Sequence, residues 1–166
     1  MLLVQSERNA LLAALASVVG VVERRHTLPI LSNLLLEKQG GRLTLLATDL
    51  ELQVSTQLDV ATGGDFAITL AARKFYDIVR ALPEGAQVKL DSKDSQVVVS
   101  AGKSRFTLQT LPAADFPRVE TGAGLGEAIR LPQKVLKRLL QLVQFAMASQ
   151  DIRYYLNGML LVLDGK

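Results

Sequence analysis

The sequence lacks cysteine and tryptophan and contains a single histidine. Without cysteine the chain can form neither a disulfide nor a thiolate zinc site, which fits a reducing compartment. Its apolar runs are far shorter than the roughly 18 residues of a membrane span, and Gln5, Glu7 and Arg8 break the N-terminal one. We therefore expect a cytoplasmic protein with no membrane segment.

Residue patterns typical of enzymes are also scarce. His26 lies alone in an expected loop, and Asp49 with Glu51 is typical of a solvated strand edge. The glycines Gly63-Gly64 and Gly122–Gly124 have neither the strand–turn–helix context nor the Lys-Ser/Thr pair of a phosphate-binding loop. No group of histidines and carboxylates has the spacing of a metal site. We expect a protein that is not an enzyme and uses no cofactor or metal.

What the chain does have is aliphatic periodicity, with 49% hydrophobic residues but only 5% aromatic ones. The periods predict an α+β protein in which a strand, a helix and three antiparallel strands occur twice in order. The first copy is expected at Met1–Gln5, Ser6–Val19 with Ser6 as N-cap, Leu31–Lys38, Arg42–Thr48 and Leu50–Val60. The second copy is expected at Phe66–Leu70, Ala71–Leu82, Gln87–Asp91, Gln96–Ser100 and Arg105–Thr110.

A stretch rich in proline and glycine, Leu111–Gly126, follows the second copy and is typical of an interdomain linker. We expect a first domain at 1–120, a linker at 121–127, and the start of a second domain at 128–166.

The pattern then begins a third time, 125 positions after its first occurrence. Aliphatic residues and one turn glycine match without gaps, which indicates an internal repeat. The matched pairs include Val4 with Ile129, Leu11 with Leu136, Leu15 with Leu140, Val18 with Val143, Leu31 with Leu156 and Gly40 with Gly165. We therefore expect Lys166 to lie on a hairpin turn whose partner strands are missing.

Positive charge is concentrated on two of the expected helices. In the third helix, Pro132–Met147, the residues Lys134, Lys137 and Arg138 share one polar arc, and the helix contains no acid. The second helix carries a mixed stripe that begins at Arg73. An ordinary solvated helix face is the simplest interpretation, but a face without acids favours contact with a polyanion.

Two of the three tyrosines, Tyr154 and Tyr155, are adjacent and directly follow Arg153 within the segment Gln150–Met159. The repeat places this segment, with Gln150 in a loop, where the first long strand of the second domain begins. Neighbours in a strand point to opposite faces, so we expect one tyrosine to pack in a sheet. An exposed ring beside a guanidinium is typical of contact with a phosphate backbone and unstacked bases.

Several segments together resemble one family, the bacterial DNA polymerase III beta subunit, or sliding clamp. The resemblance covers essentially the whole chain. The segments that carry it are Thr27–Asn33, Ala47–Glu51, Ala72–Phe75, Leu82–Gly85, Ser104–Phe106, Thr110–Pro117 and Gln150–Met159.

Family members have three domains of the DNA-clamp fold, each with duplicated strand–helix–three-strand units, helices on one face and antiparallel sheets on the other. Two subunits close head to tail into a ring that encircles and slides on duplex DNA. The resemblance implies that this chain is a truncated fragment of such a processivity factor, comprising the first domain and the opening of the second.

The resemblance also implies site residues. DNA contacts would be made by Arg25, Arg73, Gln150, Tyr154 and Tyr155, to which we add the basic arc Lys134, Lys137 and Arg138. The subunit interface would include Lys74, Phe106 and Leu108, with core packing as the alternative role of the last two. Of the family's partner-peptide pocket, only Leu156 can be placed in this chain.

The partners implied are double-stranded DNA without sequence preference and, in the full-length protein, a second copy in a homodimer. They also include the replicative polymerase, the clamp loader and other clamp-binding replication and repair proteins. The alternative function is a stand-alone clamp-like binding or decoy module that pairs with intact clamp subunits through Phe106 and Leu108. A nucleic-acid-processing enzyme with a similar fold is disfavoured by the absence of catalytic groups.

Overall fold

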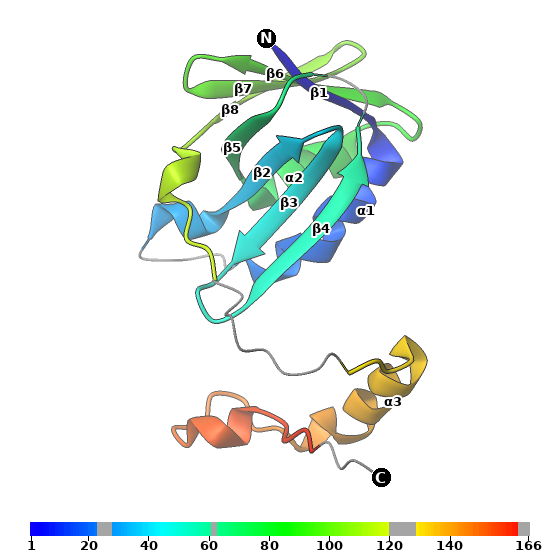
Figure 1. Ribbon diagram of the computed structural model, residues 1–166, viewed down its shortest axis with the longest axis vertical. Coiled ribbons are helices and arrows are strands. Elements are labelled where there is room, and N and C mark those ends of the chain that lie inside the picture. Colours follow the sequence, from blue (N-terminus) through cyan, green and yellow to red (C-terminus); the bar gives the residue numbers. More distant parts are fainter. Residues whose placement is uncertain (23–27, 61–62, 120–128, 163–166) are drawn as a thin grey trace. The chain divides into compact units, whose positions relative to one another are not determined.

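Alternating apolar and polar residues fill most of the first part of the chain, which folds into strands around two helices (Figure 1). The structure is a computed structural model that describes residues 1–22, 28–60, 63–119 and 129–162. The chain forms two units, Met1–Glu120 and Thr121–Lys166.

The first unit contains the expected pattern twice. Its first half comprises β1 (Leu2–Glu7), α1 (Arg8–Val18), β2 (Asn33–Gln39), β3 (Arg42–Thr48) and β4 (Gln53–Asp59). Its second half comprises β5 (Phe66–Ala71), α2 (Ala72–Ala81), β6 (Gln87–Lys93), β7 (Gln96–Ala101) and β8 (Ser104–Gln109). The described residues of this unit also form short 3-10 helices: η1 (Val19–Val21), η2 (Pro29–Ser32) and η3 (Ala113–Asp115).

The two halves exchange their first strands. The strand orders of the two antiparallel sheets are β4-β3-β2-β5 and β1-β6-β7-β8. Strand β1 of the first half thus pairs with β6 of the second, with Val4 opposite Leu90, and β5 pairs with β2, with Leu34 opposite Leu70. Because each sheet contains strands from both halves, neither half can unfold without breaking the sheet of the other.

One core lies between the sheets and the two helices. Leu11, Leu15 and Val18 recur at helical spacing along α1 and are fully buried, as are Phe75 and Val79 of α2. Both helices join the same apolar cluster as the inward residues of the strands. The helices therefore cover one side of the sheets, as the periodicity predicts.

Helix α1 does not begin where its sequence suggests. The prediction of Ser6 as N-cap is wrong, because β1 continues to Glu7, and Ser6 and Glu7 pair with Val88 and Gln87 of β6. The first helical N–H group, that of Arg8, donates instead to the carbonyl oxygen of Ala86 at 2.8 Å. A tertiary partner therefore replaces the local cap that the sequence suggests.

Strand β4 starts later than expected. Leu50 has a φ of 82°, and the Asp49 carboxylate accepts the N–H groups of Glu51 and Leu52 at 3.0 and 2.7 Å, which makes a turn. Leu50 and Leu52 are therefore 51% and 54% exposed and lie outside the strand, although the prediction placed both within it. Within Gln53–Asp59 half-buried and exposed residues alternate from Val54 onward.

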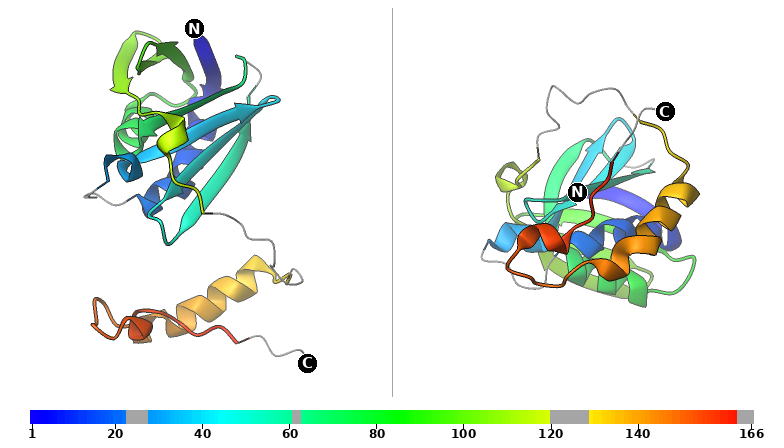
Figure 2. Two further views of the ribbon diagram at one scale, coloured as in Figure 1. Left: turned by 60° about the vertical axis from the view of Figure 1, so that its left-hand side comes forward. Right: turned by 90° about the horizontal axis from the view of Figure 1, so that it is seen from below.

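The composition predicts a linker that starts at Leu111, shortly after β8. The first residues of this segment instead pack against the first unit. Thr69 of β5 donates to the carbonyl oxygen of Leu111 at 2.9 Å and accepts its N–H at 3.0 Å. Phe116 is buried against Leu35 and Leu46, which point away from the main core that contains their neighbours Leu34, Leu36 and Leu45. The segment with η3, yellow-green in Figure 2, runs beside this sheet. Residues 111–119 thus pack as part of the first unit, whereas 120–128 lie outside the described residues.

The second unit reproduces the first at the predicted spacing. Its elements are α3 (Gln133–Val143), η4 (Gln144–Ala146) and η5 (Tyr154–Asn157), which lie 125 positions after α1, η1 and η2 at both ends. The internal repeat is therefore confirmed in three successive elements. The expected hairpin turn at Lys166 lies outside the described residues.

The strand expected to begin within Gln150–Met159 is not formed, and no strand occurs among the described residues of this unit, 129–162. Residues 154–157 form η5, the counterpart of η2, so the tyrosine pair lies before the position that corresponds to β2. In the first unit β2 is held between β3 and β5. A strand needs such hydrogen-bonding partners, and residues 158–162, which correspond to the start of β2, have none among the described residues.

Candidate nucleic-acid interface

The basic arc of α3, defined as Lys134, Lys137 and Arg138, is exposed. The opposite side of α3 is the apolar arc, whose residues correspond to the buried face of α1. The matched pairs are Leu136 with Leu11, Leu139 with Ala14, Leu140 with Leu15 and Val143 with Val18. By this correspondence the apolar arc is the packing face, so the basic arc is the face directed to solvent or to a ligand.

Helix α2 presents Arg73 and Lys74 in its first turn, both exposed. Cations at a helix N-terminus oppose the helix dipole, so local helix stability does not explain them. The Arg73 guanidinium donates from Nη2 to the carbonyl oxygen of Val22, which anchors the side chain beside the end of η1. Further along α2, Arg80 pairs with Asp77 at 2.9 Å, so the free positive charge lies at the start of the helix.

Arg8, the only base of α1, supports the fold. Its Nε donates to the carbonyl oxygen of Val79 at 3.2 Å, and its Nη2 donates to that of Arg80 at 2.7 Å. Both carbonyl groups belong to the last turn of α2, where carbonyl groups lack the full set of partners within the helix, and that of Val79 also accepts the N–H of Leu82 at 3.3 Å. The guanidinium therefore caps α2 and adds little to any DNA-binding surface.

We expect Arg8→Ala to lower the free energy of unfolding by about 1–2 kcal/mol, because it removes a charged cap from two carbonyl groups. Arg8→Lys should lose less, since one ammonium can still reach one of the carbonyl oxygens. Urea unfolding followed by far-ultraviolet circular dichroism measures both variants. Equal stability of Arg8→Ala and the parent chain would contradict the capping role.

Tyr154 and Tyr155 are both exposed, by 82% and 66%. The prediction that one of them packs in a sheet is wrong, because the pair lies in η5, and successive 3-10 residues do not alternate between two faces. The two rings meet edge to face, with centroids 5.9 Å apart and planes at 79°. The loop therefore offers an aromatic pair, where the sequence suggested a single ring.

The polar residues predicted beside this pair have different outcomes. Gln150 is exposed and has a φ of 61°, so the backbone turns sharply just before η5. Arg25 lies outside the described residues. Leu156 is half-buried in η5, and its carbonyl oxygen accepts the N–H of Ala148 at 2.9 Å.

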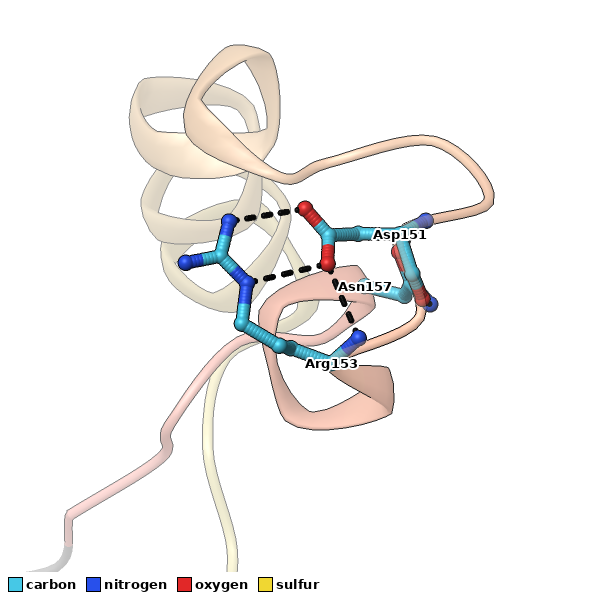
Figure 3. A network of polar contacts seen from close by, with 3 residues as sticks. All are labelled: Asp151, Arg153 and Asn157. Carbon is cyan, nitrogen blue, oxygen red and sulfur yellow. Dashed lines mark hydrogen bonds and ion pairs between the residues drawn. The ribbon is translucent and has the colours of Figure 1, made fainter.

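Arg153 is not the free guanidinium that the sequence suggested. Its Nε and Nη2 donate to Oδ1 and Oδ2 of Asp151, both at 3.0 Å, in a two-point ion pair (Figure 3). The backbone N–H of Arg153 also donates to Oδ1 of Asp151, at 2.8 Å. The pairing was not predicted from the sequence, although an acid two residues before an arginine favours it.

The side-chain and backbone hydrogen bonds from Arg153 hold the pKa of Asp151 below its ordinary value of 3.8. A lowered pKa means that the ionised carboxylate stabilises the folded loop at pH values above the ordinary pKa of an aspartate. This stabilisation is lost as pH falls through the lowered pKa. We expect the ion pair to be unchanged down to about pH 5 and to titrate below 3.8. NMR of the Asp151 carboxylate carbon measures this; a midpoint above 3.8 would contradict it.

The residues predicted for a subunit interface lie on α2 and on β8, which pairs only with β7 and so forms one edge of its sheet. Leu108 is 7% exposed and belongs to the core, whereas Phe106, on the same face of the strand, is 38% exposed. Lys74 is exposed on α2. Core packing thus accounts for Leu108 in this chain, and Phe106 remains an exposed aromatic on an open edge.

Within the part of the chain that the structure describes, no group of three histidines, cysteines or carboxylates could hold a metal ion. No helix in the described ranges is long and apolar enough to span a membrane.

Residues 2–120 match the family model described as the DNA polymerase III beta subunit, N-terminal domain. The beta sliding clamp of Pseudomonas putida is 50% identical over 158 residues, which cover 93% of this chain and 42% of that protein. The beta sliding clamp of Escherichia coli strain K12 is 46% identical over 161 residues, which cover 96% of this chain and 44% of that protein.

Solved structures agree in fold. The crystal structure of the DNA polymerase III subunit beta from Pseudomonas aeruginosa superposes with a TM-score of 0.92 at 46% identity, covering 99% of this chain and 44% of that one. The Caulobacter crescentus pol III beta structure gives a TM-score of 0.88 at 44% identity, covering 93% of this chain and 42% of that one. The predicted α+β clamp fold is confirmed, and the chain spans less than half the length of these relatives.

Proposed function

We propose a function from one premise: the chain belongs to the DNA polymerase III beta subunit family, whose members are the beta sliding clamps of DNA replication. The protein acts as a processivity factor, a ring-shaped homodimer that encircles duplex DNA and slides along it in the cytoplasm. It performs no chemistry itself and needs no cofactor. Its ring keeps the replicative polymerase on the template.

The observation that carries this proposal is the exposed basic arc of α3, opposite the face that corresponds to the buried side of α1. Lysine and arginine on such a surface contact phosphates without reading bases, so binding is independent of sequence and weakened by salt. The arc faces the DNA in the ring, together with Arg73 at the start of α2. The tethering itself comes from topology, because a closed ring slides but cannot step off.

The aromatic loop supplies a second kind of contact. Tyr154 and Tyr155 present exposed rings to the sugar–phosphate backbone or to unstacked template bases, on which aromatic side chains stack. Gln150 and Arg25 add polar contacts to phosphates.

The open edge of β8 forms part of the subunit interface. An edge strand exposes unpaired N–H and C=O groups that a partner strand can satisfy, and Phe106 adds an exposed ring there. Lys74 borders this interface, and Leu108 supports it from the core. Leu156 contributes to the pocket that captures peptides of the polymerase, the clamp loader and other replication and repair proteins.

Because the chain spans about 42–44% of its relatives' length, a second function also needs a test. The same open β8 edge lets this chain alone act as a decoy that pairs with intact clamp subunits. The mass of the native gene product separates the two functions: about 40 kDa fits three domains of this size, and 18 kDa fits the module.

The ring is tested on DNA of two shapes. We expect the full-length protein that contains this chain, once loaded on nicked circular DNA, to stay bound through a high-salt wash and to slide off after the circle is linearised. Gel filtration of the DNA–protein complex measures retention before and after cutting. Equal loss from circular and linear DNA would contradict the topological mechanism.

A further inference from the structure

The loop that carries the two tyrosines is tied to itself by three polar side chains. Asp151 and Arg153 form the two-point ion pair described above, and Asn157, at the end of η5, bonds to the backbone of Asp151 (Figure 3). Its Oδ1 accepts the N–H of Asp151 and its Nδ2 donates to the carbonyl oxygen of Asp151, both at 3.0 Å. Asp151, Arg153 and Asn157, here called the loop clasp, thus bracket Tyr154 and Tyr155 in the chain.

We propose that the loop clasp consists of positioning residues, which hold the edge-to-face tyrosine pair ready for contact with DNA. This inference rests on the proposed function of the pair. The clasp hydrogen bonds to backbone are all made at Asp151 and Arg153, before the rings, and the Asn157 side chain ties the end of η5 to this backbone. None of the three residues needs to contact the DNA itself.

The tyrosines need such support because their own packing is weak. Both rings are largely exposed, and none of the described residues of the second unit is buried. Ordering a mobile loop and its side chains at the moment of binding weakens affinity, whereas a loop that is already ordered avoids that loss. Hydrogen bonds within the loop can supply this order without a core.

The negative charge of Asp151 distinguishes a positioning role from a purely electrostatic effect on DNA binding. Asp151 is the only acid among residues 129–162, on a surface that we assign to DNA. By charge alone, its removal would add one positive charge and tighten binding to phosphates. Loss of the clasp predicts the opposite: a more positive protein that binds DNA less well.

The test uses the full 166-residue chain with Tyr76→Phe, so that all tyrosine signals come from the pair, since the chain contains three tyrosines and no tryptophan. The variants are Asp151→Ala, Asn157→Ala, and Glu84→Gln as a control that removes an exposed carboxylate from the first unit. Nuclear Overhauser contacts between the rings and near-ultraviolet circular dichroism report the geometry of the pair without DNA. Fluorescence anisotropy with a labelled duplex carrying a single-stranded tail reports affinity.

We expect Asp151→Ala to abolish the ring-to-ring contacts and to weaken DNA binding about fivefold, the scale of ordering one or two side chains. Asn157→Ala should act in the same direction without any change in charge. Asp151→Asn should fall between the parent and Asp151→Ala, because its side-chain oxygen still accepts the N–H of Arg153. Glu84→Gln should bind as well as the parent or slightly better.

Unchanged ring contacts in Asp151→Ala and Asn157→Ala, or affinity that is equal to or tighter than that of the parent, would overturn the positioning role. The double variant Tyr154→Ala with Tyr155→Ala separates this failure from failure of the proposed function. If the double variant binds DNA as the parent does, the DNA role of the pair falls, and the positioning proposal falls with it. If it binds less well while the clasp variants bind normally, only the clasp proposal is overturned.

Discussion

Gly63→Ala is expected to destabilise the first unit by about 3–5 kcal/mol, a large part of the stability of an ordinary domain. Gly63 has a φ of +83°, and a Cβ atom built there would lie 1.9 Å from the carbonyl oxygen of Leu3. Leu3 is the extra residue of a bulge in β1 and its side chain is buried, so this backbone cannot retreat. Lys38 holds Gly63 from the other side, donating from Nζ to its carbonyl oxygen at 2.7 Å.

The neighbouring glycine provides a matched control. A Cβ atom added at Gly64 would meet no other atom within 4 Å, and the φ of Gly64 is not positive, so Gly64→Ala should change stability by no more than about 0.5 kcal/mol. Thermal and urea unfolding of the two variants measure the difference. Similar stability of Gly63→Ala and Gly64→Ala would show that the backbone around Leu3 yields more easily than its pairing suggests.

Neutralising the basic arc is expected to have the largest effect on DNA binding. Replacing Lys134, Lys137 and Arg138 by glutamine should reduce the slope of log affinity against log salt by about 3, and weaken binding to duplex DNA at low salt by roughly tenfold or more. The helix should persist, because glutamine is a good helix former. Equilibrium titrations of the 166-residue chain with duplex DNA at several salt concentrations measure the slope.

The control removes the same charge from another surface. Lys89, Lys93 and Lys103 are exposed on or beside the strands of the second sheet, and glutamine at these three positions changes the net charge equally. We expect this variant to keep most of the affinity and the slope. If both triple variants lose affinity equally, DNA binding depends on net charge alone, and the basic arc makes no specific contribution to it.

Much of the fold follows from local pattern. Apolar residues at helical spacing place α1, α2 and α3, and the spacing of 125 positions recovers three elements of the second unit. These predictions succeed because burial on one face leaves a periodic trace that any short window reveals. The positions of the site residues in the chain follow from family motifs in the same way.

Other features depend on partners that are distant in sequence. Nothing local in β1 indicates that it pairs with β6 rather than with its own half, or that Arg8 caps the last turn of α2. The prediction of a helix start at Ser6 was wrong because Ser6 and Glu7 pair within the sheet instead. The prediction of a linker from Leu111 was wrong because Phe116 is buried on the outer face of a sheet.

The sequence alone determined the periodic elements, the internal repeat and the family, since each is encoded in residue types at fixed spacing. Only the tertiary structure decided that both Tyr154 and Tyr155 are exposed and that Arg153 is paired with Asp151. The physical reason is that strand alternation does not apply within a 3-10 turn, and that a guanidinium pairs with the nearest well-placed carboxylate. Both outcomes depend on distances in space, which the order of residues does not state.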